Sequence, residues 1–279
     1  MRTAFEILPA SFDASTCTLF CEVSNEGFSF CIKDETSNSF VGLAIYNYDK
    51  TKPLVGLPID LQIVFHQKKE ILSQPFNKVF VVYSLPQSVL IPFSIYNSDR
   101  NAAVMNLLHG DFYENEIILT DLIAEQSIYN CYRIPEALYK VLQEHYPNAS
   151  ITHQYTLLLK RPIEEKDKLS VIFYGQKLIA SLIINGKHQL INSYVYNTPE
   201  DASYVLRNVC HQLGTENIAL EINGLIEEDS SLYKEIYKYF ADIEFSKLPA
   251  DLNFSEEIKQ YPSHYFSYIF ALDYAYNYR

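Results

Sequence analysis

Two short hairpins carry the residues whose types and spacing could do chemistry. In each, an apolar segment runs into a short turn and an apolar segment returns, within Cys21–Ile32 (CEVSNEGFSFCI) and within Leu169–Gly186. The two turns contain Asn25, Glu26, Gly27, Tyr174, Gly175 and Gln176. A turn of this kind can hold the phosphates of ATP, because backbone N–H groups that point together form an anion site. It can equally be plain architecture.

The other reactive side chains form no recognisable catalytic pattern. The sequence contains no P-loop, no G-x-G-x-x-G and no G-x-S-x-G motif, and its seven histidines are scattered without metal-ligand spacing. Cys17, Cys21 and Cys31 could lie on neighbouring strands, but a zinc site there lacks an identifiable fourth ligand. We therefore expect these cysteines to be small core residues, and we predict neither a metal site nor a catalytic residue.

Charge and composition disfavour several classes of partner. The chain has 279 residues and a net charge of −12, with 48% hydrophobic and 20% charged residues, which is an ordinary globular balance. The negative charge opposes binding to nucleic acid or to anionic membranes. The apolar runs are too short for membrane insertion, and the first residues lack the pattern of a signal peptide. Five cysteines do not suggest a disulfide framework, so we expect a cytoplasmic protein.

The second half of the sequence has the pattern of a small α/β domain in the order β-β-β-α-β-α-β-α. Its predicted elements are strands Lys168–Tyr174, Leu178–Ile184 and His188–Tyr196, a helix from Thr198 to Gly214, strand Asn217–Ile222, a helix opened by Asp229 or Ser230, strand Asp242–Leu248 and a closing helix Ser263–Tyr276. Asn185-Gly186 predicts a tight hairpin, because both residues tolerate positive φ. Thr198 and Asp201 have the spacing of a capping box.

The first half gives a similar series with an extra block inside it. Its predicted elements are strands Thr18–Val23, Gly27–Lys33 and Phe40–Tyr48, helix Leu57–Leu72, strand Lys78–Tyr83, strand Ser127–Cys131, helix Pro135–Tyr146 and strand Ser150–Leu157. The extra block after Ser84 holds a strand near Val89–Tyr96, a helix over Ser98–His109 and a strand near Glu116–Ile123. The charged segment Lys160–Lys168 predicts a linker. We predict two duplicated domains, residues 1–162, with a subdomain inserted at about 85–125, and residues 163–279.

This duplicated order resembles the actin-like ATPase superfamily, which is built from two ribonuclease H-like domains around a nucleotide cleft. The block after Ser84 looks like the insertion of the cytoplasmic actin-like proteins of bacterial cell division and pilus assembly. More narrowly, EVSNEGFSFCI and the layout after it resemble an uncharacterised bacterial domain-of-unknown-function family with an actin-like fold. The resemblance implies an α/β protein of two ribonuclease H-like domains, with an inserted subdomain in the first.

In that superfamily the first hairpin of each domain carries an Asp followed two residues later by Gly, which serve the metal ion and the phosphates. This chain contains no Asp-x-Gly anywhere. Where the resemblance places a glycine pair beside the adenosine, only Gly224 is present. We therefore expect both hairpins to be structural, with Glu26 as an ordinary turn charge.

The sequence thus favours a non-catalytic protein of actin-like ATPase fold with degenerate phosphate loops and a protein-binding or scaffold role, without a cofactor. The alternative is a divergent ATPase that binds ATP and magnesium in the inter-domain cleft through Asn25, Glu26 and Gly27. A homo-oligomer with an acidic, Tyr-rich surface is a third possibility. If the cleft is kept without a nucleotide, we expect the two hairpin tips to face each other across it, with Tyr174 filling the gap.

Overall fold

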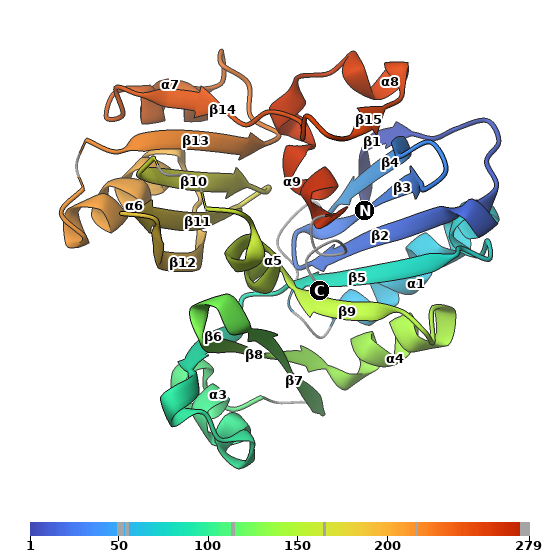
Figure 1. Ribbon diagram of the computed structural model, residues 1–279, viewed down its shortest axis with the longest axis horizontal. Helices are drawn as coiled ribbons and strands as arrows, with labels where there is room; N and C mark the ends of the chain where they lie inside the picture. Colours follow the sequence, from blue (N-terminus) through green and yellow to red (C-terminus); the bar gives the residue numbers. More distant parts are fainter. Residues whose placement is uncertain (49–52, 54–55, 113–114, 164–165, 216, 274–279) are drawn as a thin grey trace. The chain divides into compact units, whose positions relative to one another are not determined.

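The computed structural model describes residues 1–48, 53, 56–112, 115–163, 166–215 and 217–273. The chain divides into two compact units, Met1–Lys160 and Arg161–Asp273. Each unit is built on its own β-sheet, and the first unit also carries a second, smaller sheet (Figure 1). Within the described residues, no helix combines the length and the apolar character that crossing a membrane would require.

The main sheet of the first unit has the strand order β1-β4-β3-β2-β5-β9. Its strands are β1 (Arg2–Ile7), β2 (Cys17–Ser24), β3 (Gly27–Asp34), β4 (Ser39–Asn47), β5 (Lys78–Ser84) and β9 (Ser150–His153). Strands β2, β3 and β4 form an antiparallel meander, whereas β5 runs parallel to β2, and β9 runs parallel to β5. Every residue of β2 is buried, as expected for a central strand that has the antiparallel β3 on one side and the parallel β5 on the other.

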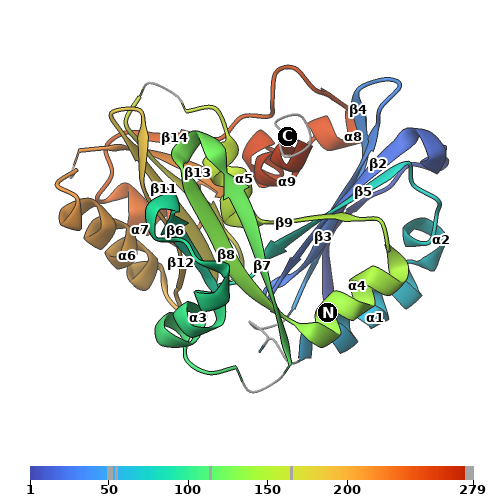
Figure 2. The same cartoon turned by 60° about the horizontal axis from the view of Figure 1, so that its bottom comes forward.

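Two helices cover one face of this sheet and form the core with it. Figure 2 shows α1 (Leu57–Gln67) and α4 (Glu136–His145) side by side on that face. The ring of Phe65 on α1 stacks on His145 at a centroid distance of 4.0 Å. The short helices η1 (Ala14–Thr16) and α2 (Lys69–Leu72) lie in the connections of this unit, and α5 (Gln154–Lys160) follows β9 directly.

The inserted block forms a separate three-stranded sheet with the order β6-β8-β7. Its elements are β6 (Ser88–Pro92), η3 (Phe93–Ile95), η4 (Ser98–Arg100), α3 (Asn101–His109), β7 (Glu116–Ile123), η5 (Ala124–Gln126) and β8 (Ile128–Pro135). Ser127, at a φ of 53°, reverses the chain so that β8 pairs with β7 along its whole length. The inserted sheet therefore continues to Pro135, beyond the expected limit near residue 125, and the strand predicted at Ser127–Cys131 belongs to it.

A buried arginine holds the inserted block together. Arg133 on β8 is 0% exposed. Its guanidinium donates to side-chain oxygens of Gln87, Asn106 and Glu116, with the ion pair to Glu116 at 3.3 Å. It also donates to the carbonyl oxygens of His109 and Gly110. A buried charge needs such partners, because an unpaired one is strongly destabilising.

The sheet of the second unit has the strand order β12-β11-β10-β13-β14. The elements of this unit are β10 (Lys168–Phe173), β11 (Lys177–Ile184), β12 (Lys187–Val195), α6 (Pro199–Gln212), β13 (Ala219–Gly224), α7 (Ser231–Tyr237), β14 (Ile243–Phe245), β15 (Asn253–Phe254) and α8 (Glu256–Lys259). The predicted capping box is confirmed, because the side chains of Thr198 and Asp201 each bond the other residue's backbone N–H. Asn185 and Gly186 have the positive φ values, 52° and 66°, that the predicted tight turn requires.

The two units share one strand order. An antiparallel meander (β2, β3, β4 and β10, β11, β12) is followed by two parallel strands on the other side of its first strand (β5, β9 and β13, β14). This match confirms the predicted shared order of the halves. The first unit differs by its inserted sheet and by β1, a strand that the sequence reading missed and that pairs with the outer edge of β4.

The end of the described chain differs from the single closing helix predicted over Ser263–Tyr276. It consists of three short pieces, η6 (Ser263–Tyr265), α9 (Ser267–Phe270) and η7 (Ala271–Asp273), and residues 274–276 lie outside the described residues. This segment is hydrogen-bonded to β13 and to the loop after it, since His264 bonds the carbonyl oxygen of Ile226 at 2.8 Å and Ser267 donates to Asn223 of β13 at 2.8 Å.

Candidate functional site

The turn of the first hairpin is closed by its own serine. The hydroxyl oxygen of Ser24 accepts hydrogen bonds from the backbone N–H groups of Glu26 and Gly27, both at 3.1 Å, and donates to the carbonyl oxygen of Gly27 at 3.2 Å. These are the N–H groups that a phosphate would need at the tip of such a turn. In this turn the Ser24 hydroxyl oxygen accepts the hydrogen bonds of both N–H groups instead.

The other residues of this turn are fixed by the strands around them. Asn25 and Glu26 are 8% and 6% exposed, so both residues of the turn are buried. The backbone N–H of Tyr48 donates to the carbonyl oxygen of Glu26 at 2.8 Å. A Cβ atom on Gly27 would lie 2.1 Å from the carbonyl oxygen of Tyr46, so close packing against β4 already explains the glycine.

A tyrosine closes the turn of the second hairpin. The hydroxyl of Tyr196 donates to the carbonyl oxygens of Tyr174 and Gly175 at 3.1 and 3.0 Å, and its backbone N–H donates to Gln176 at 2.9 Å. The ring of Tyr174 packs edge-on against Tyr268, with a centroid distance of 5.3 Å. The ammonium group of Lys177 lies 4.6 Å from the centroid of the same Tyr174 ring. The tip is thus held by contacts within its own unit, and the role of Tyr174 across the cleft stays a prediction.

The two turns are equivalent positions of the duplicated fold. Tyr48 donates to Glu26 as Tyr196 donates to Gln176, in each case from the residue just after the third strand of the meander. Gly224, the remaining glycine candidate, ends β13 with a φ of 98°, and a Cβ atom there would lie 2.2 Å from the carbonyl oxygen of Phe173. Its pairing with β10 therefore accounts for it without a nucleotide.

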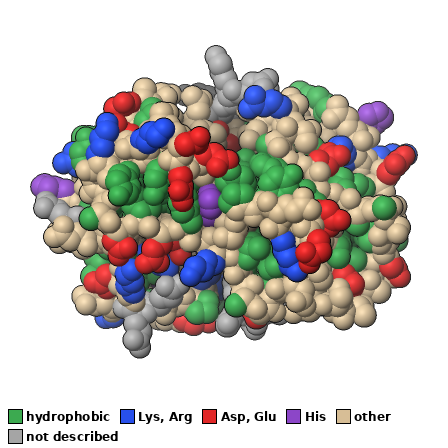
Figure 3. Space-filling view, turned by 90° about the horizontal axis from the view of Figure 1, so that it is seen from above, with side chains coloured by type: hydrophobic (Ala, Val, Ile, Leu, Met, Phe, Trp, Pro, Cys, Tyr) green, Lys and Arg blue, Asp and Glu red, His purple; other side chains and the backbone are tan. Residues whose placement is uncertain are grey.

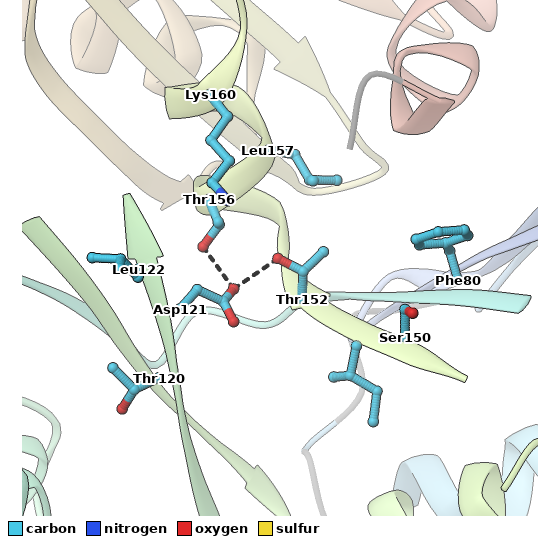
Figure 4. Close-up of a pocket in the computed structure, with 10 residues that line it drawn as sticks. Phe80, Thr120, Asp121, Leu122, Ser150, Thr152, Thr156, Leu157 and Lys160 are labelled. Carbon is cyan, nitrogen blue, oxygen red and sulfur yellow. Dashed lines mark hydrogen bonds between the residues drawn. The ribbon is translucent and has the colours of Figure 1, made fainter. Parts of the chain in front are cut away.

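A pocket of about 300 Å³ lies in the first unit, where β7 of the inserted sheet meets β9 and α5. Figure 4 shows the side chains that surround it. It is lined by Phe80, Thr120, Asp121, Leu122, Ser150, Ile151, Thr152, Thr156, Leu157 and Lys160. The sequence reading missed this site, although Thr120-Asp121 interrupts the apolar strand EIILTDLI and could have drawn attention to it.

Asp121 is the hydrogen-bond centre of the pocket. Its Oδ2 accepts hydrogen bonds from the hydroxyls of Thr152 and Thr156, both at 2.7 Å, and from the backbone N–H of His153 at 2.9 Å. Its Oδ1 accepts from the hydroxyl of Tyr132 at 3.2 Å. Burial and the neighbouring carboxylate raise the pKa of Tyr132, so this hydroxyl remains a donor. With both oxygens engaged, Asp121 serves as an anchor rather than as a general base.

Further buried polar groups connect the inserted sheet to the rest of the first unit by hydrogen bonds. Asn130, on β8, donates to the hydroxyl of Thr156 at 2.9 Å and accepts from that of Ser88. The ring of His153 accepts at Nδ1 from the backbone N–H of Tyr155, so the contact of its Nε2 with the carbonyl oxygen of Leu85 at 3.0 Å is a donated bond. The inserted sheet is therefore bonded directly to β9 and α5.

Lys160 supplies the positive charge of the pocket. It lies at the end of α5, above Thr156 in Figure 4, and within the described residues no carboxylate pairs with it. Leu122 and Leu157 give the pocket an apolar wall. A lysine ammonium group beside an apolar surface can donate hydrogen bonds to a carboxylate group of a ligand. The chemistry of the pocket is therefore suited to binding an acidic group that has an apolar neighbour.

No metal site emerges in the part of the chain that the structure describes. Within it, no group of three or more His, Cys, Asp or Glu side chains could hold a metal ion. The five cysteines are all buried, and burial raises the pKa of the Cys21 thiol. Figure 3 shows acidic and basic side chains interspersed on one face of the molecule, without a basic patch.

Solved structures with the same architecture identify the fold. A protein from Bacteroides thetaiotaomicron, described as having an actin-like ATPase fold and unknown function, superposes with a TM-score of 0.71 at 21% identity, over 84% of this chain and 91% of that one. The PilM–PilN type IV pilus biogenesis complex matches with a TM-score of 0.55 at 10% identity, over 93% and 98%. The ethanolamine utilization protein EutJ from Carboxydothermus hydrogenoformans matches with a TM-score of 0.50 at 10% identity, over 95% and 89%.

These likenesses show that the chain has the actin-like ATPase fold, with two ribonuclease H-like domains. No curated protein matches the sequence. The predicted membership of a domain-of-unknown-function family with this fold is confirmed by a family match over residues 10–243. The chain belongs to the family described as "Protein of unknown function (DUF3822)".

Proposed function

We propose that this protein is a non-catalytic member of the actin-like fold, with degenerate phosphate loops, and that it binds another protein or serves as a scaffold. The observation that carries the proposal is the closed first turn, in which the Ser24 hydroxyl accepts from the N–H groups of Glu26 and Gly27. A bound phosphate would have to displace these bonds, each worth about 0.5–1.5 kcal/mol. It would do so without an aspartate to hold magnesium.

Two observations support a protein partner. The pocket beside Lys160 offers a cation and an apolar wall, which suit an acidic side chain of a partner. PilM, which has this fold, is known in a complex with PilN. The odd number of cysteines, all of them buried, supports a cytoplasmic location for such a protein.

The alternative function is a divergent ATPase that binds its nucleotide in the inter-domain cleft. One observation favours it. The side-chain oxygen of Asn25 is buried and, within the described residues, has no hydrogen-bond partner. An unpaired buried acceptor is costly, and a metal-bound water is one group that could satisfy it.

Titration calorimetry with ATP and magnesium separates the two functions. We expect no binding by the wild type and none by Ser24→Ala, which frees two N–H groups but supplies no metal ligand. Micromolar binding by the wild type with measurable turnover would overturn the proposal. Affinity capture from the native host tests the partner, and we expect Lys160→Glu to reduce recovery of the same protein that the wild type captures.

A further inference from the structure

The sheet of the second unit ends in a long strand whose outer edge is open. β12 is the last strand in the order of this sheet, as Figure 1 shows, and within the described residues no strand pairs with its far side. None of its nine residues is buried. An edge strand presents backbone N–H and C=O groups that can pair with another strand.

The same position in the first unit is already paired. β4 is the third strand of the first meander, as β12 is of the second. Its outer edge pairs with β1 in an antiparallel ladder that runs from Arg2↔Asn47 to Ile7↔Leu43. The fold therefore accepts an additional antiparallel strand at this position, and in the second unit that place is open.

β12 has few of the features that usually protect an edge, namely one lysine and one bulge, both near its start. Its sequence, KHQLINSYV, has no proline or acidic residue, and Lys187 at its start is its only Lys or Arg. The register shift in its pairing with β11 leaves Gln189 as the extra residue, so that Leu190–Val195 runs regularly. A bulge near one end leaves the longer part of the edge available for pairing.

We propose that β12 pairs antiparallel with β12 of a second copy of this chain, so that the two sheets become continuous. A twofold axis at the central residue, Ile191, pairs Leu190–Asn192 with the same residues of the second copy. The Gln189 bulge lies outside this central segment, so Lys187 comes close to the exposed Val195 of the other copy without being in regular register with it. No two like charges face each other, although each chain has a net charge of −12. The proposal rests on the strand order and is independent of the proposed function.

Val195 offers a test that depends on the sign of the introduced charge. It is 63% exposed, so substitutions should be tolerated. Val195→Lys brings two lysines close together at each end of the joint strand pair, and Val195→Glu brings a glutamate close to Lys187 at each end. We expect the dimer dissociation constant to rise roughly three- to thirtyfold for the lysine variant and to fall by a similar factor for the glutamate variant. Non-specific charge repulsion predicts the opposite order, because Val195→Glu makes the chain more acidic.

Sedimentation velocity over a range of concentrations measures these constants, with a wild-type dimer of twice the 32.3 kDa chain mass. Ile63→Lys on α1, which is 46% exposed, is the matched control and should leave the constant unchanged. Amide hydrogen exchange should slow in residues 190–195 of the wild type as concentration rises. A monomer at every concentration, or a dimer whose constant follows net charge and whose β12 exchange does not change, would overturn the proposal.

Discussion

The hydroxyl oxygen of Ser24 lies 3.1 Å from the backbone nitrogen of Gly27 and is its hydrogen-bond acceptor. The same oxygen also accepts from Glu26 and donates to the carbonyl oxygen of Gly27. A side chain of the hairpin thus satisfies the backbone groups on which a phosphate-binding turn depends. In this chain the turn is stabilised from within.

Removal of this hydroxyl should cost stability without creating a nucleotide site. Ser24→Ala leaves two buried N–H groups without their acceptor, so we expect the free energy of unfolding to fall by about 1–3 kcal/mol. Chemical denaturation measures the change. Ser73→Ala, at an exposed turn position, is the control and should stay within about 0.5 kcal/mol. A Ser24→Ala protein as stable as the wild type would contradict the role given to the hydroxyl.

Gly27 should tolerate no side chain. Because a Cβ atom there would lie 2.1 Å from the carbonyl oxygen of Tyr46, Gly27→Ala must displace backbone. We expect a loss of more than about 2 kcal/mol in thermal or chemical unfolding. Gly56→Ala is the control, since nothing lies within 4 Å of a Cβ atom at that position and its φ is −84°. Equal stability of the two variants would refute this account of the glycine.

Arg133 should be essential for the inserted block. Arg133→Met removes a buried charge that bonds Gln87, Asn106 and Glu116, and it leaves these groups unsatisfied. We expect a loss of about 3–5 kcal/mol, with faster amide exchange confined to β6, β7, β8 and α3. Lys140→Met breaks an exposed i,i+4 pair with Glu136 and should change stability by less than about 0.5 kcal/mol. Unchanged exchange in the inserted sheet of the Arg133 variant would contradict the prediction.

Glu221 should make the second unit sensitive to acid. Burial raises the pKa of its carboxyl, but hydrogen bonds from Ser170 and Lys168 outweigh burial and hold the pKa below its usual value of 4.5. A carboxyl with a lowered pKa in the folded state stabilises the protein above the unfolded value, and this stability is lost as pH falls through the folded pKa. Glu221→Gln should therefore be less stable than the wild type at pH 7 and approach it in acid.

Denaturation at several pH values measures that convergence. Glu256→Gln is the control for the loss of a carboxylate, because Glu256 pairs with Lys259 on the surface and such pairs contribute little to stability. A constant difference between Glu221→Gln and the wild type from pH 7 down to pH 3 would exclude the linkage.

Elements specified by local sequence were predictable, and those specified by distant contacts were not. Thr198 and Asp201 cap α6 through bonds three residues apart, and Asn185-Gly186 forms its turn alone, so both could be predicted from the sequence. The strand predicted over Ser150–Leu157 instead ends at His153 and becomes α5. Asp121, more than 30 residues away, takes the His153 N–H and two threonine hydroxyls there, and no local pattern encodes that.

The candidate site shows the same division. The absence of an Asp-x-Gly motif could be seen in the sequence. The hydrogen bonds by which Ser24 closes the turn could be identified only in the structure. The burial of Glu26 could not be predicted, because a turn residue is normally exposed unless other parts of the fold cover it. The pocket was missed because Thr120 and Asp121 meet Ser150 and Lys160 only in the folded chain.

Asp121 should set the position of the inserted sheet against β9 and α5. Asp121→Asn keeps the shape but turns one acceptor oxygen into a donor, so it cannot accept from the two threonine hydroxyls and the His153 N–H as before. We expect a loss of about 2–4 kcal/mol, since hydrogen bonds to a charged group are each worth about 1.5–3 kcal/mol and some will rearrange.

Amide exchange should rise in β9 and α5 while β12 and β13 stay protected. Asp99→Asn, on exposed η4, is the matched control for the charge change. If β9 and α5 are as well protected from exchange in Asp121→Asn as in Asp99→Asn, Asp121 does not hold the inserted sheet against them.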